Sequence, residues 1–298
     1  MTSLSDFAGT LVLVGAGKMG AALLEGWLGL GLDPARVVVL EPAPSAALAT
    51  LAARGLRVNP ELASLGEAAV VVLAVKPQTA PEAVPGLKTL IGSATLVVSI
   101  MAGRTLRFLG DALPGAALVR SMPNTPAAIG RGITVAVANR GVTAAQRDLA
   151  HRLLAATGAV EWVDDEGLLD AVTAVSGSGP AYVFLLAESL ARAGAAAGLP
   201  PDLAARLARA TVEGSGELMH RSPLDPAALR QNVTSPGGTT AAALEVLMAP
   251  NGMQPLLTRA VAAATHGDGE VLVHFPGGDL RVVLRDGRAT LVGPAEPA

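Results

Sequence analysis

Three glycine-containing stretches hold the residue types that could bind a ligand. Residues 15–20 read GAGKMG, residues 175–182 read VSGSGPAY and residues 232–240 read NVTSPGGTT. Glycine lets a backbone approach a bound molecule closely, and backbone N–H groups at a helix start attract anions. The second and third stretches add hydroxyl groups but no carboxylate or imidazole. We predict that residues 175–182 form a glycine-rich turn that opens a long helix, with Pro180 in the first turn of that helix. The second and third stretches therefore predict binding sites for a small anionic or polar ligand, although an ordinary helix start explains residues 175–182 equally well.

The first stretch stands where a dinucleotide-binding turn needs it. A β-branched run, residues 10–14, precedes it and an Ala- and Leu-rich helical pattern follows to residue 30. In this G-x-G-x-x-G pattern Gly15 allows the tight turn, Gly17 lets a pyrophosphate approach and Gly20 allows close helix–strand packing. The context favours dinucleotide binding over a merely structural glycine-rich turn.

An acidic residue ends the next predicted strand, residues 36–40. Glu41 lies about twenty residues beyond the glycines, where a carboxylate accepts hydrogen bonds from the ribose hydroxyls and repels a 2′-phosphate. This favours NAD, but Arg54 or Arg57 could reach a phosphate, so NADP stays open. A solvated carboxylate at a strand end is the plainer alternative.

Further strands alternate with helical or irregular segments, which predicts a doubly wound parallel sheet. Ligands bind such sheets outside the carboxyl ends of the strands. Lys76, Asn124 and residues 98–103 follow predicted strands, and Pro123 and Pro126 hold Asn124 in a rigid loop, so we expect these residues to border the cofactor. The predicted strands are residues 10–14, 36–40, 69–75, 95–99, 117–120 and 133–137.

Residues 164–266 read as helices throughout. The predicted helices are residues 167–174, 181–197, 202–219, 226–231, 240–248 and 253–265. The helix at 181–197 is apolar on nearly all sides and must be buried, yet about 100 residues offer little interior. We therefore expect an intertwined homodimer, with a compact monomeric core as the alternative.

Composition narrows the partners. The 298 residues are 51% hydrophobic and 2% aromatic, with a net charge of −3 and no cysteine. A weakly acidic surface offers no footprint for nucleic acid or anionic membranes, and the absence of cysteine excludes disulfides and thiolate chemistry. Without a signal peptide or an uninterrupted apolar run of membrane-spanning length, we expect a soluble, cytoplasmic protein with no metal site.

Five stretches together resemble the pyrroline-5-carboxylate reductase family, in the order that the family has them over residues 8–266. They are GAGKM (15–19), AVKPQ (74–78), MPNTP (122–126), SGSGPAY (176–182) and VTSPGGTT (233–240), the last two being highly specific. The resemblance implies a nucleotide-binding domain followed by a helical dimerisation domain, with dimers often gathered into larger rings. It also implies NAD(P)H-dependent reduction of the cyclic imine 1-pyrroline-5-carboxylate to L-proline.

The resemblance carries residue roles with it. It places substrate or product contacts at Glu166, Thr239 and Thr240, and the substrate carboxylate near the backbone of Ser235 and Gly237. It places cofactor contacts at Val14, Gly15, Ala16, Gly17, Lys18, Met19, Asn59, Ala74, Val75, Lys76, Pro77, Ile100, Met101, Ala102 and Asn232.

The residue inventory agrees with imine reduction. A carbonyl reductase needs a proton donor, commonly His, Lys or Tyr, whereas all four histidines lie outside the motifs. A protonated imine carries its own positive charge, so hydride transfer needs no strong acid, and Thr240 near the ring nitrogen is the expected catalytic residue. A β-hydroxyacid dehydrogenase would need a lysine in residues 164–266, which contain none, and a non-catalytic NAD(P)-binding protein is a further alternative.

The end of the chain departs from this pattern. From residue 267 onward, alternating apolar runs separated by PGGD and RDGR predict a short β-meander where the family usually ends on a helix. The expected organisation is a Rossmann domain at 1–163, a helical substrate and dimerisation domain at 164–266, and an atypical β-rich tail at 267–298.

Overall fold

The computed structural model describes residues 3–266, 269–273, 280–285 and 288–294. The chain divides into two compact units, the first ending at Gly177 and the second beginning at Ser178. The sequence placed its division earlier, after residue 163. The following helix α6 (Leu168–Val172) joins the first unit because Leu169 is fully buried against Val135 and Val137.

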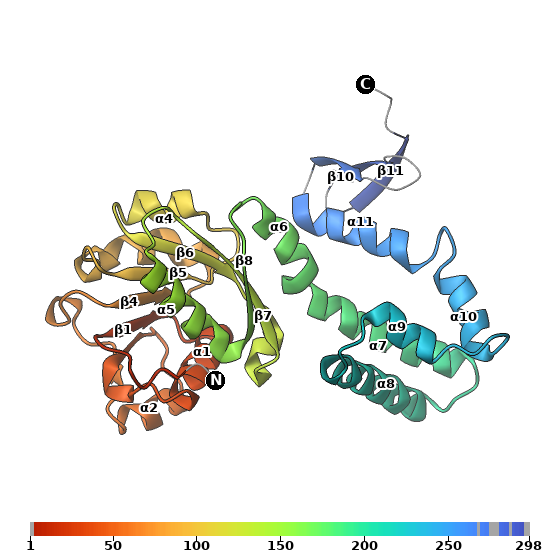
Figure 1. Ribbon diagram of the computed structural model, residues 1–298, viewed down its shortest axis with the longest axis horizontal. Helices are drawn as coiled ribbons and strands as arrows, with labels where there is room; N and C mark the ends of the chain where they lie inside the picture. Colours follow the sequence, from red (N-terminus) through yellow and green to blue (C-terminus); the bar gives the residue numbers. More distant parts are fainter. Residues whose placement is uncertain (1–2, 267–268, 274–279, 286–287, 295–298) are drawn as a thin grey trace. The chain divides into compact units, whose positions relative to one another are not determined.

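The first unit is built on an eight-stranded sheet in the order β3-β2-β1-β4-β5-β6-β7-β8 (Figure 1). A Rossmann-type fold is thereby confirmed. The strands are β1 (Leu11–Val14), β2 (Val37–Leu40), β3 (Arg57–Val58), β4 (Val70–Leu73), β5 (Leu96–Ser99), β6 (Ala117–Met122), β7 (Gly132–Ala138) and β8 (Gly158–Trp162).

The sheet is not parallel throughout. β7 runs antiparallel to β6, and β8 is parallel to β7. Only nine residues separate β6 from β7, which is too few for the crossover that a parallel neighbour requires. The sequence analysis missed β8 because its residues alternate between half-buried and exposed, and it missed β3 because that strand has only two residues.

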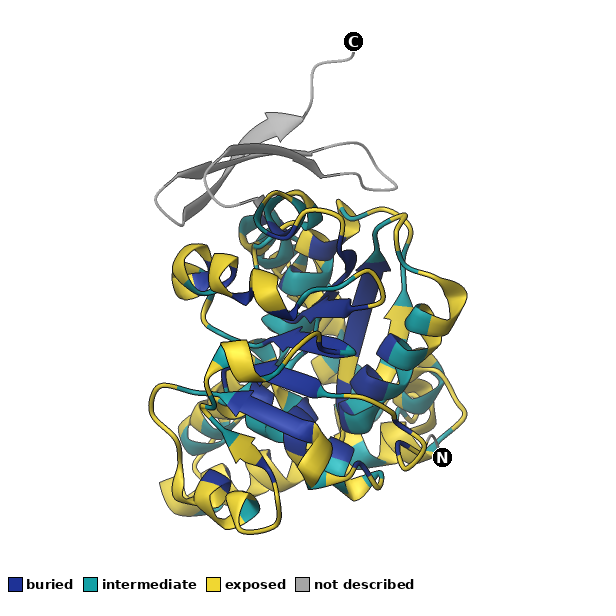
Figure 2. Ribbon diagram, turned by 90° about the vertical axis from the view of Figure 1, so that its left-hand side faces the viewer, coloured by how far each residue is buried: buried dark blue, intermediate teal, exposed yellow. Residues whose placement is uncertain are grey.

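Alternate strand residues enter two apolar cores, one on each face of the sheet. Leu11 and Leu13 belong to one core, and Val12 and Val14 belong to the other. Burial on both faces explains why the central strands read as continuous apolar runs, and Figure 2 shows them dark blue. The covering helices are α1 (Lys18–Gly29), α2 (Ala46–Ala52), α3 (Ala80–Ala83), α4 (Leu106–Ala112) and α5 (Ala144–Leu154).

The second unit is helical, as expected. Its helices are α7 (Gly179–Ala196), α8 (Pro201–Arg221), α9 (Pro226–Asn232), α10 (Thr239–Leu247) and α11 (Met253–His266). α7 has no buried residue, and Phe184 and Leu185 are 70% and 57% exposed. An apolar helix of this length needs cover that the single chain does not supply.

Residues 175–182 do not form the open glycine turn that we expected. A π-helix, Thr173–Gly177, follows α6 directly, and only a bend at Ser178 separates it from α7. Gly177 lies close to the Met122 side chain, because a Cβ on Gly177 would lie 2.6 Å from Met122 Cε. Pro180 occupies the first turn of α7, as predicted.

This continuity also creates one helical run, Leu168–Ala196, that is long and apolar enough to cross a membrane by length and composition alone. The sequence analysis expected no such run, because Gly177, Gly179 and Pro180 interrupt it. Only 11% of its apolar window is buried within the chain. The run therefore includes the exposed apolar surface of α7.

The predicted C-terminal meander is confirmed at the level of backbone pairing. β9 (Gly269–Val273), β10 (Leu280–Arg285) and β11 (Arg288–Pro294) form an antiparallel sheet in the order β11-β10-β9. The connecting residues 274–279 and 286–287, which hold most of the PGGD and RDGR sequences, lie outside the described residues.

Trp27 fastens α1, and with it the glycine loop, to the rest of the first unit. Its side chain is 1% exposed, and its indole Nε1–H donates to the Leu153 carbonyl at 2.8 Å. We expect Trp27→Ala to lower the free energy of unfolding by about 3–5 kcal/mol through cavity formation and a lost hydrogen bond.

Trp162→Ala is the matched control, because Trp162 is only half-buried. The chain has two tryptophans, both in the first unit, so in urea titrations the remaining indole fluorescence reports unfolding of that unit. Equal losses in the two variants would show that α1 is not anchored in this way.

Candidate active site

The loop between β1 and α1 is shaped by close backbone contacts. Gly15 has a φ of 92°, and a Cβ there would lie 2.8 Å from the carbonyl carbon and oxygen of Ala74. A Cβ on Gly20 would collide with the Gly15 carbonyl. Neither glycine tolerates a side chain, because β4 and the loop itself occupy the space.

Gly17 differs from these two glycines. A Cβ at Gly17 would meet no protein atom within 4 Å, so packing does not demand a glycine there. Gly17 is the N-cap residue of α1 and has no side-chain cap, which leaves the first N–H groups of the helix facing outward. This is the arrangement that a pyrophosphate requires, with open space beside backbone donors.

Glu41 and Asn59 lie together next to this loop. One carboxylate oxygen of Glu41 accepts from the Ala16 N–H at 2.8 Å, and the other accepts from the Ala43 N–H at 3.0 Å. The Asn59 amide bonds both backbone groups of Glu41, at 2.8 and 2.9 Å. The structure thus places two of the predicted cofactor residues in contact with each other and with the glycine loop.

The remaining cofactor candidates of the first unit follow β4 and β5. The Ala74 N–H donates to the Val14 carbonyl at 2.8 Å, and the Ile100 N–H donates to Leu73 at 3.0 Å. Lys76 caps a short 3-10 turn, Pro77–Thr79. Because β1, β2, β4 and β5 are parallel, their carboxyl ends bring residues 14–19, 41, 74–77 and 100–102 to one edge of the sheet.

Asn124 has a structural partner in the chain. Its side-chain oxygen accepts from the Ile133 N–H at 2.9 Å and so braces the start of β7. The predicted nicotinamide contact at Asn124 stays a prediction, since the bond found here engages only the oxygen of its amide.

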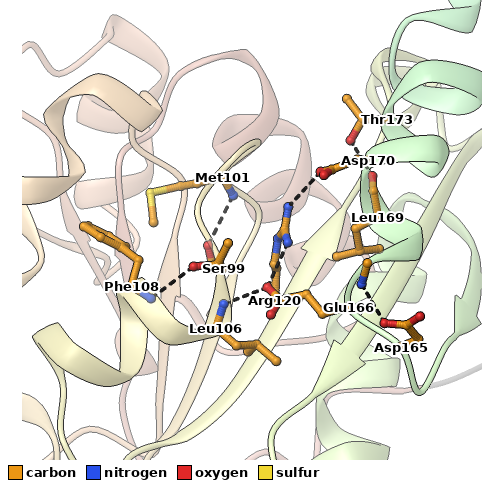
Figure 3. Close-up of polar contacts among 12 residues, drawn as sticks. Ser99, Met101, Leu106, Phe108, Arg120, Asp165, Glu166, Leu169, Asp170 and Thr173 are labelled. Atoms are coloured by element: carbon orange, nitrogen blue, oxygen red, sulfur yellow. Dashed lines mark hydrogen bonds and ion pairs between the residues drawn. The ribbon is translucent and has the colours of Figure 1, made fainter. Parts of the chain in front are cut away.

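An ion pair between a buried arginine of β6 and a half-buried glutamate just before α6 also reaches the start of α4 (Figure 3). Arg120 is 5% exposed, and its Nη1 lies 2.8 Å from Glu166 Oε1. The same oxygen accepts from the Leu106 N–H at 2.7 Å. Asp170 contributes a longer contact to Arg120 Nη2, at 3.7 Å.

Sequence reasoning assigned no role to Arg120. The signal for it is a cation inside the otherwise uncharged strand ALVRSM, where every residue but the last is buried. Lys and Arg are almost never fully buried unless they are paired. Such a cation indicates an acidic partner nearby, which the structure identifies as the half-buried Glu166.

The predicted substrate loop of the second unit ends at a helix start. Gly238 is the N-cap of α10, and Thr239 and Thr240 are its first two residues. The Gly238 N–H donates to the Ser235 carbonyl at 3.1 Å, and a Cβ on Gly238 would lie 2.5 Å from Ser235 Oγ. With no side-chain cap, the first N–H groups of α10 can receive a carboxylate.

Asn232 is the last residue of α9 and is exposed. It lies two residues before Thr234, whose hydroxyl caps the Arg230 carbonyl at 2.7 Å. Of the candidates in this loop, Thr240 is half-buried, whereas Ser235, Gly237 and Thr239 are exposed. The loop is thus locally ordered, with its hydroxyl and N–H groups on the surface of the second unit.

Two family models match the chain. Residues 166–271 match the model described as pyrroline-5-carboxylate reductase dimerisation, and residues 10–103 match the model described as NADP oxidoreductase coenzyme F420-dependent. The first covers the helices from α6 onward, and the second covers the glycine loop with Glu41 and Asn59.

Proteins similar to this chain match it over nearly their whole length. Pyrroline-5-carboxylate reductase of Pseudomonas aeruginosa is 38% identical over 88% of this chain and 96% of its own, and that of Synechocystis is 40% identical over 85% and 95%. The solved Coxiella burnetii pyrroline-5-carboxylate reductase gives a TM-score of 0.79 at 33% identity, over 87% and 97% of the chains. The Plasmodium falciparum pyrroline carboxylate reductase, solved with NADP bound, gives 0.71 at 29% identity, over 86% and 95%. This chain belongs to the pyrroline-5-carboxylate reductase family.

Proposed function

We propose that this protein is a pyrroline-5-carboxylate reductase that transfers a hydride from a reduced nicotinamide dinucleotide to 1-pyrroline-5-carboxylate, giving L-proline. The observation that carries the proposal is the identity of 38% over 96% of a relative of that name. The glycine loop and the α10 start supply the two kinds of binding group that this reaction needs.

The dinucleotide is proposed to bind the first unit. Gly17 and the N-terminus of α1 offer the pyrophosphate open space and backbone donors, and Glu41 accepts from ribose hydroxyls. Asn59, Lys76 and Met101 belong to the same proposal, together with Val14, Gly15, Ala16, Lys18, Met19, Ala74, Val75, Pro77, Ile100, Ala102 and Asn124. Asn232, which belongs to the second unit, is proposed as a further cofactor contact on the basis of the family resemblance.

The substrate carboxylate is proposed to bind the start of α10. Its N-terminal N–H groups lack a side-chain cap, and Ser235 and Gly237 present further backbone groups. A carboxylate there gains both hydrogen bonds and the helix dipole. Thr239 and Thr240 are adjacent residues at the same helix start. The Thr240 hydroxyl is proposed to hold the imine nitrogen.

The proposed reaction needs no strong proton donor from the protein. The bound cofactor supplies the hydride, and a protonated cyclic imine becomes neutral when it receives one. A hydroxyl such as that of Thr240 orients the ring without changing its own protonation state. Orientation by backbone N–H groups and one hydroxyl is therefore the contribution that these residues make.

Glu166 is proposed to contact the substrate as well. Both of its contacts within the chain fall on one oxygen, Oε1, which is held by Arg120 and Leu106. Arg120 thus acts as a positioning residue, because it fixes the carboxylate that the substrate meets.

A homodimer is proposed to cover the apolar helices. Exposed apolar side chains gather on the second unit, and two open grooves of about 500 and 490 Å³ lie between α7 and α8. The family model for these residues is a dimerisation domain. With a partner subunit instead of lipid on α7, we propose a soluble enzyme that works in the cytoplasm.

Thr240→Ala tests the proposed catalytic role. A hydrogen bond to a charged group contributes about 1.5–3 kcal/mol, so we expect turnover to fall roughly ten- to hundredfold while the fold is kept. Absorbance of the reduced cofactor, followed with 1-pyrroline-5-carboxylate present, measures the rate, and circular dichroism checks the fold.

Thr240→Ser is the matched control, because it keeps the hydroxyl and should retain most of the rate. Wild-type kinetics in Thr240→Ala would contradict the assignment. A wild-type protein that binds the dinucleotide but never oxidises it with this substrate would support the non-catalytic alternative instead.

Glu166→Leu tests the ion pair. It leaves the buried Arg120 guanidinium without its close partner, and we expect a loss of about 3 kcal/mol in the free energy of unfolding. Asp170→Asn is the control, because this 64% exposed carboxylate at 3.7 Å should contribute less than about 1 kcal/mol. Urea titration compares the two, and equal effects would remove Glu166 from its special position.

Phe184→Glu tests the proposed interface. In a two-fold dimer each subunit contributes its own Phe184 to the interface, and burying one Phe contributes about 1.5–3 kcal/mol. Two substituted side chains should therefore raise the dimer dissociation constant at least about a hundredfold. Ile129→Glu is the control, since Ile129 is 77% exposed but lies in the first unit. Analytical ultracentrifugation measures the constant; a dimer unaffected by Phe184→Glu would place the interface elsewhere.

A further inference from the structure

We propose that this protein prefers NADH to NADPH, and that Glu41 is the residue that discriminates between them. The inference rests on the proposed function, because it concerns the same dinucleotide site. It goes further by choosing between two cofactors that differ only in a 2′-phosphate on the adenosine ribose.

The Glu41 carboxylate is held in place by the backbone. Its Oε2 accepts from the Ala16 N–H at 2.8 Å across 25 residues of sequence, and its Oε1 accepts from the Ala43 N–H at 3.0 Å. Ala16 lies within the glycine loop, so the negative charge lies beside the proposed pyrophosphate position. In a dinucleotide the adenosine ribose is bonded to the pyrophosphate, so the ribose is the group that we expect beside Glu41.

Asn59 holds the backbone of Glu41, from which this carboxylate projects. Its side-chain oxygen accepts from the Glu41 N–H at 2.8 Å, and its side-chain nitrogen donates to the Glu41 carbonyl at 2.9 Å. Asn59 has a φ of 48°, the only positive φ at a residue other than glycine in the described part of the chain. Asn tolerates this left-handed conformation better than most residues, and here it lets one side chain clamp both backbone groups of Glu41.

The charge of Glu41 is not paired with a cation within the described residues. Among the residues that the structure describes, neither Arg54 nor Arg57 nor Lys18 forms an ion pair with it within 4.0 Å. Sites that accept NADP place an Arg where the 2′-phosphate lies. A fixed, unpaired carboxylate instead accepts hydrogen bonds from the two free hydroxyls of NADH and repels a phosphate.

Repulsion of this kind is large enough to measure. Two unit charges about 4 Å apart repel by about 1 kcal/mol in water and about 4 kcal/mol near a protein surface, which corresponds to roughly five- to several hundredfold in affinity. The Plasmodium falciparum relative was solved with NADP bound, so we assign the preference of this chain to Glu41 and not to the fold.

Calorimetric titration of the full-length protein with NAD⁺ and with NADP⁺ tests the proposal without turnover. We expect NADP⁺ to bind at least about tenfold more weakly than NAD⁺ at low ionic strength. The ratio of the two dissociation constants should fall toward one as salt screens the repulsion. Equal binding, or tighter binding of NADP⁺, would overturn the preference. A ratio that does not respond to salt would overturn its electrostatic cause.

Glu41→Gln tests the residue itself. Glutamine keeps an oxygen that can accept from the Ala16 N–H but removes the charge, so NADP⁺ affinity should rise and the ratio should approach one. Glu161→Gln is the control, because it makes the same change of net charge on β8. An unchanged ratio in Glu41→Gln would overturn the assignment to Glu41.

The outcomes separate this inference from the proposed function. If neither dinucleotide binds the wild-type protein, the proposed function fails and the inference fails with it. If both bind and the protein oxidises reduced cofactor with 1-pyrroline-5-carboxylate but favours the phosphorylated form, only the inference fails. The salt dependence of the wild type decides the electrostatic claim even if Glu41→Gln does not fold.

Discussion

The close backbone contact between the glycine loop and the end of β4 fixes the position of the proposed dinucleotide site in the first unit. Gly15 lies so near the Ala74 carbonyl that any Cβ would collide with it. This contact brings the start of α1 over the edge of the sheet, where the neighbouring strand ends carry the remaining candidates. Gly17, which has open space beside it, is then the position where we propose that the dinucleotide meets the backbone.

Two carboxylates in the first unit are held in different ways. Glu41 is oriented by backbone N–H groups and has no ion pair among the described residues, so its charge acts on whatever lies beside it. Glu166 shares its charge with the buried Arg120 and with the Leu106 N–H, so it joins β6, α4 and α6. The first carboxylate is suited to selecting a ligand, and the second to fixing the position of a helix.

The second unit differs, because its helices leave many apolar side chains exposed. α7 has no buried residue, although most of its side chains are apolar. Helices of this composition are stable only when another apolar surface covers them. We therefore regard the proposed homodimer as a requirement of the fold of this unit.

Local sequence determined much of this protein. Continuous apolar runs predicted β1, β2, β4, β5, β6 and β7, since central strands are buried on both faces, and the helical pattern predicted α7 to α11. The glycine loop and Glu41 were found because their spacing from a strand is diagnostic. Lys76, Asn124 and residues 98–103 were found from their places after predicted strands. The other cofactor and substrate residues came from the family resemblance, and all these roles stay predictions.

Tertiary structure decided what depends on contacts between distant segments. The edge strand β8 and the partner of Arg120 involve residues far apart in the chain, which no local pattern encodes. The antiparallel direction of β7 instead follows from its short connection to β6. Residues 175–182 were misread as a turn because glycine and proline usually end a helix. In the structure a π-helix, Thr173–Gly177, leads into α7 through a bend at Ser178.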